Sequence, residues 1–278
     1  MVWHFRDRHV TIGSRPLVMG IVNVTPDSFS DGGQFASTPA AIEHGLQLAG
    51  EGADFLDIGG ESSRPGSQRV SLEEELARVI PVVRGLAAKT DVPISVDTAK
   101  AEVARRALEA GAFIVNDITA GLGDASMLDV VRELGAGIIL MHMQGTPETM
   151  QGNPTYENVV EEVGAFLETR IQSCTDAGIN PKRIAIDPGI GFGKTLEHNL
   201  ILLRDLGALA AIGRPVVLGV SRKGLLGQIT GRPRGERLAS SLAAVCYCAT
   251  LGAAHILRVH DVAPTVDAAK VIGAIAGL

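Results

Sequence analysis

Short apolar runs recur along the chain, and each is about as long as one buried strand. They are continuous and do not alternate with polar residues, which is typical of strands in a parallel sheet covered on both faces. Eight such runs occur, at residues 17–22, 55–58, 94–96, 114–115, 138–141, 184–186, 216–220 and 256–259. We therefore predict a parallel sheet of eight strands.

Helical patterns with recognisable ends lie between these runs. Ser71 and Glu74 have the spacing of a capping box, and Thr38 followed by Pro39 predicts another helix start. The predicted helices cover residues 38–50, 72–88, 100–109, 126–134, 156–176, 196–209, 236–250 and 266–276. Strands and helices therefore alternate along the chain.

A weak internal repeat strengthens this prediction. The phrases EGADFLDIGG, EAGAFIVNDI, ELGAGIILMH and TLGAAHILRV share one layout, in which a helix end is followed by Gly-Ala, a short strand and polar residues. Eight such units joined by right-handed crossovers close into a (β/α)8 TIM barrel, whereas an open doubly wound sheet is the alternative. We predict a single barrel domain over residues 1–278. The alternating residues 1–15 would form a short β-hairpin that closes its bottom.

Composition limits the possible partners. A net charge of −6 provides no basic field for nucleic acid, and no apolar run is long enough to span a bilayer. No signal peptide is recognisable, and Cys174, Cys246 and Cys248 do not form a disulfide framework. We expect a cytoplasmic protein that binds small molecules, not nucleic acid or membrane.

Polar residues follow every predicted strand. In a barrel, the carboxyl ends of all strands open on one mouth, so these side chains should converge. The candidates are Asn23, Asp57, Asp97, Thr98, Asn116, Asp117, His142, Asp187, Ser221, Lys223, Arg258 and His260. Any one of them could be a helix cap or a loop-stabilising residue, and Asp57, Thr98 and Asp117 fit that role without a ligand. The whole set together indicates a site.

One half of this set suits a flat heterocycle. Asp97, Asn116 and Asp187 offer acceptors for ring N–H and NH2 groups, and a carboxylate can accept from two adjacent donors. Lys223 could serve either this half or an anion.

The other half suits a phosphate or diphosphate. Arg64, Arg258 and His260 are donors that match such an anion. Asn23 carries a carbonyl oxygen that Mg²⁺ would accept, with phosphate oxygens and water as the remaining ligands.

Two further patterns resemble known sites without matching them. Residues 187–195, DPGIGFGKT, look like a phosphate loop, but Pro188 and Lys194 stand where the two nucleotide motifs require glycine. This segment is therefore predicted to be a glycine-rich loop between a strand and a helix. His142 and His260 lack a third ligand and do not predict a metal pair.

The motifs at these strand ends resemble those of the dihydropteroate synthase family of folate biosynthesis, over nearly the whole chain. The first two motifs below are together highly specific for that family. The matching segments are MGIVNVTPDSFSDGG (19–33), DIGGESSRPG (57–66), SVDT (95–98), NDI (116–118), LMHMQGTP (140–147), DPGIGFGK (187–194), GVSRKG (219–224) and RVHDV (258–262).

The resemblance implies a barrel that condenses 6-hydroxymethyl-7,8-dihydropterin diphosphate with 4-aminobenzoate, commonly as a homodimer, with sulfonamides as competitors. By the same resemblance, the pterin contacts are Asp97, Asn116, Met141, Asp187, Phe192 and Lys223. The 4-aminobenzoate site and its closing loops are Thr25, Pro26, Phe29, Ser63, Arg64, Pro65 and Ser221. The catalytic group is Asn23 with Mg²⁺, Arg64, Lys223, Arg258 and His260, and diphosphate is bound by Arg64, Arg258 and His260.

Some alternatives remain open at this point. A pterin-binding methyltransferase has a similar pocket, but it would need neither the loops at 25–33 and 62–66 nor Arg258 with His260. A catalytically lapsed paralogue is a second alternative, because Ser63 stands where the family usually has threonine. For the synthase reaction, the neutral arylamine needs no strong base, so we expect a dissociative displacement at the pterin methylene.

Overall fold

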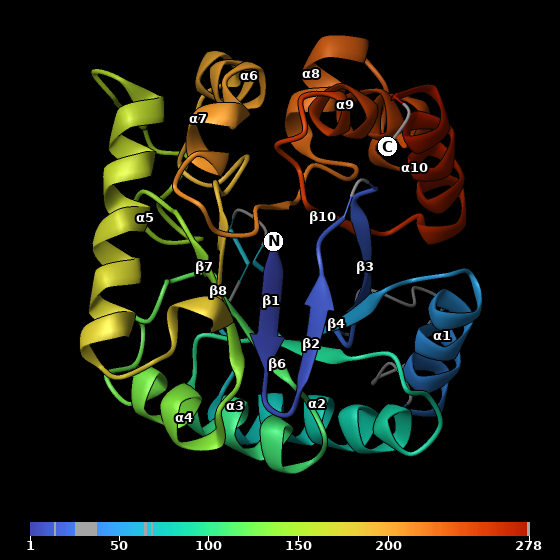
Figure 1. The fold of residues 1–278 in the computed structure, drawn as a ribbon, viewed down its shortest axis with the longest axis vertical. Helices are drawn as coiled ribbons and strands as arrows, with labels where there is room; N and C mark the ends of the chain where they lie inside the picture. The colour runs from blue at the N-terminus through green and yellow to red at the C-terminus, as the bar shows by residue number, and fades with distance from the viewer. Residues whose placement is uncertain (14, 26–37, 64–65, 68, 277–278) are drawn as a thin grey trace.

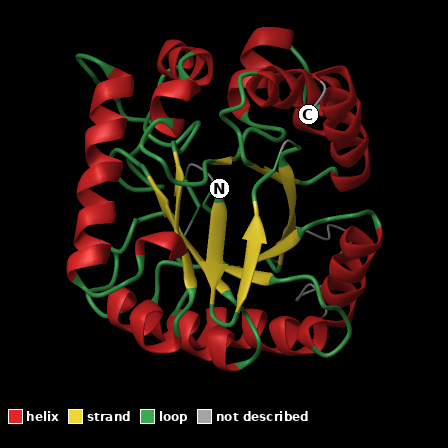
Figure 2. Ribbon diagram, in the orientation of Figure 1, coloured by secondary structure: helices red, strands yellow, loops and turns green. Residues whose placement is uncertain are grey.

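The computed structural model describes residues 1–13, 15–25, 38–63, 66–67 and 69–276. Eight parallel strands form one sheet in the order β8-β7-β6-β5-β4-β3-β10-β9, and helices surround it (Figures 1 and 2). The two edge strands meet through a parallel bridge between Ile186 and Val216. In addition, the Ile186 N–H donates to the Pro215 carbonyl at 2.9 Å. The sheet is thus a nearly closed barrel, as predicted, and not an open doubly wound sheet.

The barrel strands are β3 (Leu17–Asn23), β4 (Phe55–Gly59), β5 (Ile94–Asp97), β6 (Ile114–Asp117), β7 (Gly137–Met141), β8 (Ile184–Asp187), β9 (Val217–Leu218) and β10 (Ile256–Val259). The helices are α1 (Thr38–Gly50), α2 (Leu72–Ala87), α3 (Ala101–Glu109), α4 (Met127–Leu134), α5 (Val159–Asp176), α6 (Leu196–Arg204), α7 (Leu206–Ala210), α8 (Gly224–Thr230), α9 (Leu238–Thr250) and α10 (Val262–Ala276). Short 3-10 turns, η2 (Pro181–Arg183) and η3 (Arg234–Glu236), precede β8 and α9.

The structure confirms the predicted strands to within a few residues, but it differs from the prediction at three helices. Helix α10 begins at Val262, before Pro264, because proline is tolerated in the first turn of a helix. The single helix predicted over 196–209 is broken at Asp205. Helix α8 was missed because it begins with glycine and carries no capping side chain.

Only half of the predicted capping box at α2 is present. Ser71 accepts a hydrogen bond from the Glu74 N–H at 3.2 Å. The Glu74 carboxylate forms an ion pair with Arg78, one turn along the helix. An ion pair between side chains four residues apart on the helix therefore takes the place of the reciprocal bond.

An aromatic cluster fills the bottom of the barrel. Strands β1 (Val2–Phe5) and β2 (Arg8–Thr11) pair as an antiparallel hairpin, drawn in dark blue in Figure 1. Trp3 and Phe5 from the hairpin pack on Phe55 of β4, with ring centroids 5.5–5.9 Å apart. The Trp3 indole also donates to the Arg183 carbonyl at 3.0 Å. The predicted hairpin therefore closes the bottom of the barrel.

The outer core lies between the strands and the surrounding helices and consists mainly of Val, Leu, Ile and Ala. Within the part of the chain that the structure describes, no helix is both long and apolar enough to cross a membrane.

Truncation of Trp3 should test the bottom cluster. Trp3→Ala removes a fully buried side chain and should lower the free energy of unfolding by about 3–5 kcal/mol. Denaturant unfolding followed by circular dichroism measures the change. Val2→Ala is the control, because Val2 is adjacent but 39% exposed. A loss equal to that of the control would show that the hairpin contributes nothing to the core.

Candidate active site

A cavity of about 560 Å³ opens where the barrel strands end. Most of the strand-end and loop residues predicted from the sequence line it together, although they are far apart in the chain. The predicted residues in its lining are Asn23, Thr25, Ser63, Asp97, Phe192, Ser221, Lys223, Arg258 and His260. The mouth of the barrel therefore collects the polar groups, as the topology predicts.

The other predicted residues fall into two groups. Asn116, Met141 and Asp187 lie at or one residue before the ends of their strands and are buried, at 4–5% exposure, and they are not part of the cavity lining. Pro26, Phe29, Arg64 and Pro65 lie outside the described residues, so their predicted roles stay predictions.

A partly buried ion-pair network spans three strands at the cavity. Arg258 of β10 donates through Nε to Asp57 and through Nη2 to Asp97, each at 2.6 Å. Asn116 donates to the same Asp57 oxygen at 3.1 Å. Asp57 is therefore neither a helix cap nor a loop-stabilising residue, but the fully buried partner of Arg258.

Electrostatics in this network follow from burial. Burial raises the pKa of Asp97 to about 7, although Arg258 opposes the shift. Burial works against the charge of Arg258, but Asp57 and Asp97 outweigh it and raise the pKa of Arg258. The guanidinium is thus held as a cation between two acids, and its Nη1 makes no hydrogen bond to any described residue.

A second charged group lies across the cavity. The Asp187 carboxylate accepts from the Gly189 N–H at 2.7 Å through Oδ1. A Cβ placed on Gly219 would lie 3.8 Å from both Asp187 Oδ2 and Lys223 Nζ, so these two groups face one small space. Burial raises the pKa of Asp187.

Lys223 lies between this carboxylate and an aromatic ring. Its ammonium group donates to the Ile190 carbonyl and lies 4.5 Å from the centroid of the Phe192 ring. Burial lowers the pKa of Lys223 to about 8, while Asp187 opposes this shift. A planar ligand in this part of the cavity would meet a carboxylate, an ammonium group and a ring face.

His260 is present at the cavity as a neutral imidazole. Burial, with Arg258 and Arg222 as the main nearby charges, lowers the pKa of His260 to about 3. Its Nδ1 lies 3.1 Å from the Ser221 hydroxyl. His260 can therefore offer a hydrogen bond to an anion, but not a positive charge.

The loop that carries Ser221 is tied down by ion pairing. Arg222 adopts a left-handed conformation with φ 57°, and its side chain forms a two-pronged pair with Asp261. Its backbone N–H donates to Ser241 at 2.9 Å. These contacts offset the cost of the unfavourable backbone conformation.

Asp117 and Thr98 make local hydrogen bonds within their own loops, which is the role that the sequence allowed for them without a ligand. Asp117 accepts hydrogen bonds from Thr119 and from the Gly121 N–H, and Thr98 accepts one from the Lys100 N–H. Both stabilise loops.

Sequence reasoning missed Lys194, which was considered only as a mismatch to nucleotide motifs. Its Nζ lies 2.9 Å from Nδ1 of His142, and the residue is buried. The sequence signal that could have identified it is its position directly after the glycine-rich loop that follows β8.

No group of three or more His, Cys, Asp or Glu side chains among the described residues is placed to hold a metal ion. Asn23 lines the cavity and carries one amide oxygen.

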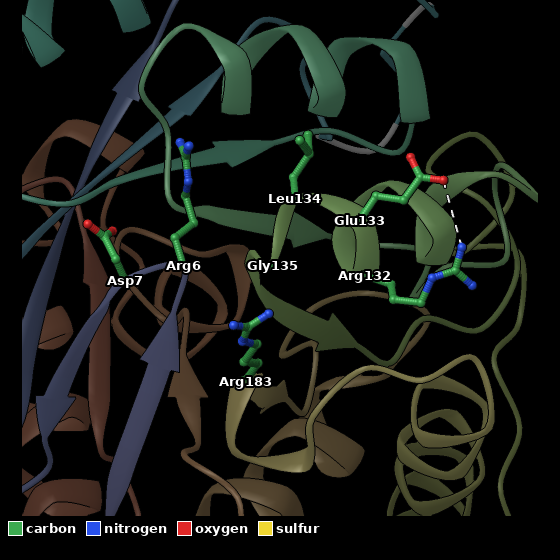
Figure 3. Close-up of a pocket in the computed structure, with 7 residues that line it drawn as sticks. All are labelled: Arg6, Asp7, Arg132, Glu133, Leu134, Gly135 and Arg183. Carbon is green, nitrogen blue, oxygen red and sulfur yellow. Dashed lines mark ion pairs between the residues drawn. The ribbon is translucent and has the colours of Figure 1, made fainter.

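Another concave region, of about 520 Å³, lies at the amino ends of β7 and β8 (Figure 3). Its three arginines point in different directions. Arg6 donates to the Leu108 and Ala112 carbonyls, and Arg132 forms ion pairs with Asp129 and Glu133. This region therefore lacks the converging groups that the barrel mouth has.

The pterin-binding enzyme family matches residues 19–260, and the chain belongs to it. More particularly, the chain is 48% identical to the dihydropteroate synthase of Escherichia coli strain K12 over 94% of this chain and 92% of that protein. The dihydropteroate synthase of Yersinia pestis in complex with a sulfonamide drug superposes with a TM-score of 0.94 at 42% identity over 100% of both chains.

The Xanthomonas albilineans dihydropteroate synthase is a further solved relative. Its complex with 4-aminobenzoic acid superposes with a TM-score of 0.93 at 50% identity, covering 100% of this chain and 98% of that one. Its complex with 7,8-dihydropteroate superposes with a TM-score of 0.89 at 47% identity over 100% of both chains. The resemblance inferred from the motifs is thus confirmed over the full length.

The ionisation of Lys223 gives a direct test of the site electrostatics. Because the Asp187 carboxylate raises the pKa of Lys223, Asp187→Asn should move the Lys223 titration midpoint below about 8. NMR of isotope-labelled lysine over a pH series measures this midpoint. Asp176→Asn removes an exposed carboxylate on α5 and should leave the midpoint where it is. An upward shift in Asp187→Asn would contradict the proposed pairing.

Proposed function

We propose that this protein is a dihydropteroate synthase. It joins 6-hydroxymethyl-7,8-dihydropterin diphosphate to 4-aminobenzoate and releases 7,8-dihydropteroate and diphosphate. The observation that carries the proposal is that Asp97, Lys223 and the paired cation Arg258 line one cavity, with the buried Asp187 facing the same small space as Lys223. Relatives of nearly equal length bind 4-aminobenzoic acid and 7,8-dihydropteroate.

The pterin would occupy the deep end of the cavity. Its ring N–H and NH2 groups are donors, and Asp187 offers them Oδ2 because Oδ1 already accepts from Gly189. Asn116 is oriented by its bond to Asp57, so its amide is held in place before any ligand arrives. Phe192 and Met141 supply apolar contacts to the ring, and Lys223 supplies a donor.

The diphosphate would lie toward Arg258 and His260. Arg258 keeps its charge, and its Nη1 is not used by the two acids that anchor it. His260 adds a hydrogen bond without a charge, since its pKa of about 3 keeps it neutral. Arg64, outside the described residues, is proposed as a further diphosphate contact.

Mg²⁺ fits this site only together with the diphosphate. Mg²⁺ usually keeps several waters and binds through one or two protein oxygens plus substrate phosphates. Asn23 supplies one such oxygen in the cavity lining, and the other ligands would be diphosphate oxygens and water. When bound, the ion would neutralise charge on the leaving diphosphate.

4-Aminobenzoate would enter from the outer end of the cavity. Ser63, Ser221 and Thr25 line the cavity and are proposed to contact this substrate. Pro26, Phe29, Arg64 and Pro65 are proposed to complete the site from outside the described residues. Sulfonamides share the shape of 4-aminobenzoate and are proposed as competitors, since a relative binds such a drug.

The reaction is proposed to begin with departure of the leaving group. The C–O bond at the pterin methylene breaks, and its electron pair leaves with the diphosphate, which Arg258 and His260 stabilise. The methylene cation spreads into the electron-rich dihydropterin ring, where Asp97 and Asp187 favour positive charge. The neutral arylamine nitrogen then forms the C–N bond and releases a proton to water, so no strong base is required.

A homodimer in the cytoplasm is the proposed setting. Large apolar side chains are exposed on the adjacent helices α9 and α10 and at the C-cap of α9: Tyr247 (48%), Leu251 (43%), Val271 (57%) and Ile275 (82%). A second copy of the chain could cover this surface. The free cysteines Cys174, Cys246 and Cys248 are typical of a reducing compartment.

The oligomeric state can be tested by sedimentation. The wild-type protein should sediment at twice the mass of one chain. Tyr247→Glu with Val271→Glu should shift it toward the monomer, because charge would be buried in the interface. Leu122→Glu, at a 62% exposed position away from α9 and α10, is the matched control. A dimer that resists the double substitution would contradict this surface.

An activity assay tests the proposed reaction and the role of the metal ion. The purified protein should form 7,8-dihydropteroate from the two substrates with Mg²⁺, and EDTA should abolish product formation. Asn23→Ala should raise the Mg²⁺ concentration required by about tenfold, the usual effect of losing one ligand or its support. Asp187→Asn should lose product formation at any Mg²⁺ concentration because pterin donors lose their acceptor. Absence of product in the wild type would refute the proposed function.

A further inference from the structure

Lys194 is buried where a lysine is rarely found. The residue is only 3% exposed to solvent. Its Nζ lies 3.0 Å from the Gly189 carbonyl, 2.9 Å from the Phe192 carbonyl and 2.9 Å from Nδ1 of His142. An ammonium group has three N–H donors, which these three acceptors can use, and the His142 carbonyl lies farther away at 3.4 Å. Lys194 therefore ties the loop after β8 to the end of β7.

The segment that Lys194 belongs to has no regular structure of its own. Gly189, Gly191 and Gly193 all have positive φ, so the backbone forms no repeating hydrogen-bond pattern here, although the Phe192 N–H donates to the Gly189 carbonyl at 3.0 Å. Each carbonyl from residue 189 to 195 accepts a hydrogen bond from a side chain. The donors are Lys194 for Gly189 and Phe192, Lys223 for Ile190, Gln151 for Gly191, Tyr156 for Gly193, and Asn199 for Lys194 and Thr195.

This segment packs backbone against backbone on the loop after β7. A Cβ on Gly189 would lie 1.8 Å from the His142 carbonyl oxygen, and one on Gly193 would lie 2.3 Å from that of Gln144. Glycine is required at both positions for this approach.

The same segment supplies three contacts to the pterin end of the cavity. The Gly189 N–H holds Asp187, the Ile190 carbonyl holds Lys223, and the Phe192 ring lies against Lys223. Two of the residues concerned, Gly189 and Phe192, are those whose carbonyls Lys194 gathers. Displacing them would move the acceptor, the ammonium group and the ring together.

We propose that Lys194 is a positioning residue that presets the pterin-binding end of the cavity by gathering the carbonyls of Gly189 and Phe192 against His142. The inference deepens the proposed function, because it assigns Lys194 to the pterin half of that site. Lys194 acts through Asp187, Phe192 and Lys223, not on the reacting atoms.

The charge states of His142 and Lys194 agree with this geometry. Burial lowers the pKa of His142 to about 3, so its ring is neutral and Nδ1 can accept from Lys194. Burial and the nearby Lys223 lower the pKa of Lys194 to about 7, while Asp187 opposes the shift. The edge of the His142 ring also packs on Phe166 at 4.9 Å, which keeps the acceptor in place.

Lys194→Met tests the proposal, because methionine has a similar length but no donor. The KM for the pterin diphosphate should rise about tenfold to a hundredfold, as expected for hydrogen bonds from a charged group. The KM for 4-aminobenzoate at saturating pterin should stay close to that of the wild type. The Lys223 titration midpoint, measured by NMR, should also leave its position near 8. The control is Lys182→Met, which replaces an exposed lysine before β8. It should change neither the KM for the pterin diphosphate nor the Lys223 titration midpoint.

A structural role alone predicts a different result. A variant with a lower melting temperature but an unchanged pterin KM and Lys223 midpoint would overturn the proposal, as would equal losses for both substrates. If Lys194→Met does not fold, His142→Phe decides, since it keeps the ring and removes the acceptor. An unchanged pterin KM in that variant would overturn the proposal.

Failure of the proposed function can be told apart from failure of this inference. Calorimetric binding of 6-hydroxymethylpterin needs no catalysis. If the wild type forms no product but binds this pterin, weaker binding by Lys194→Met still supports the inference. Equal binding by both would overturn it.

Discussion

The ion-pair network of Arg258, Asp57 and Asp97 is the constraint on which the mouth of the barrel depends. It joins strands β10, β4 and β5, which are separated by up to 201 residues in sequence. Burying three charges is costly unless each is paired and hydrogen-bonded, and here the cation is shared between both acids. The arrangement keeps a cation inside the barrel, ready for an anion, without leaving it unpaired.

The barrel interior is divided into an apolar bottom and a polar mouth. Trp3, Phe5 and Phe55 fill the bottom with aromatic surface, so the charged network above them is far from bulk water at that end. Low polarity strengthens the electrostatic interactions of the network and perturbs its ionisation. The lowered pKa values of Lys223 and His260 and the raised pKa of Asp97 have this common cause.

Much of the fold was predictable because its signals are local. Apolar runs, glycine after helices and polar residues after strands follow from hydrogen bonding and burial within each βα unit. The errors arose where local signals are weak: α8 begins with glycine, and α10 includes Pro264 in its first turn. At the site, residue type and strand position together indicated Asp97, Asn116, Asp187, Lys223 and Arg258. The same reasoning undervalued Asp57 and missed the role of Lys194, since both depend on partners distant in sequence.

By itself, the sequence determined the barrel, the strand ends that carry the site and the family of the chain, because periodicity and motifs are written along one dimension. Only the tertiary structure decided that Arg258 is shared by two acids, that His260 is neutral and that Lys194 gathers three acceptors. Those properties depend on burial and on distances between residues from different units. Neither quantity can be obtained from spacing along the chain.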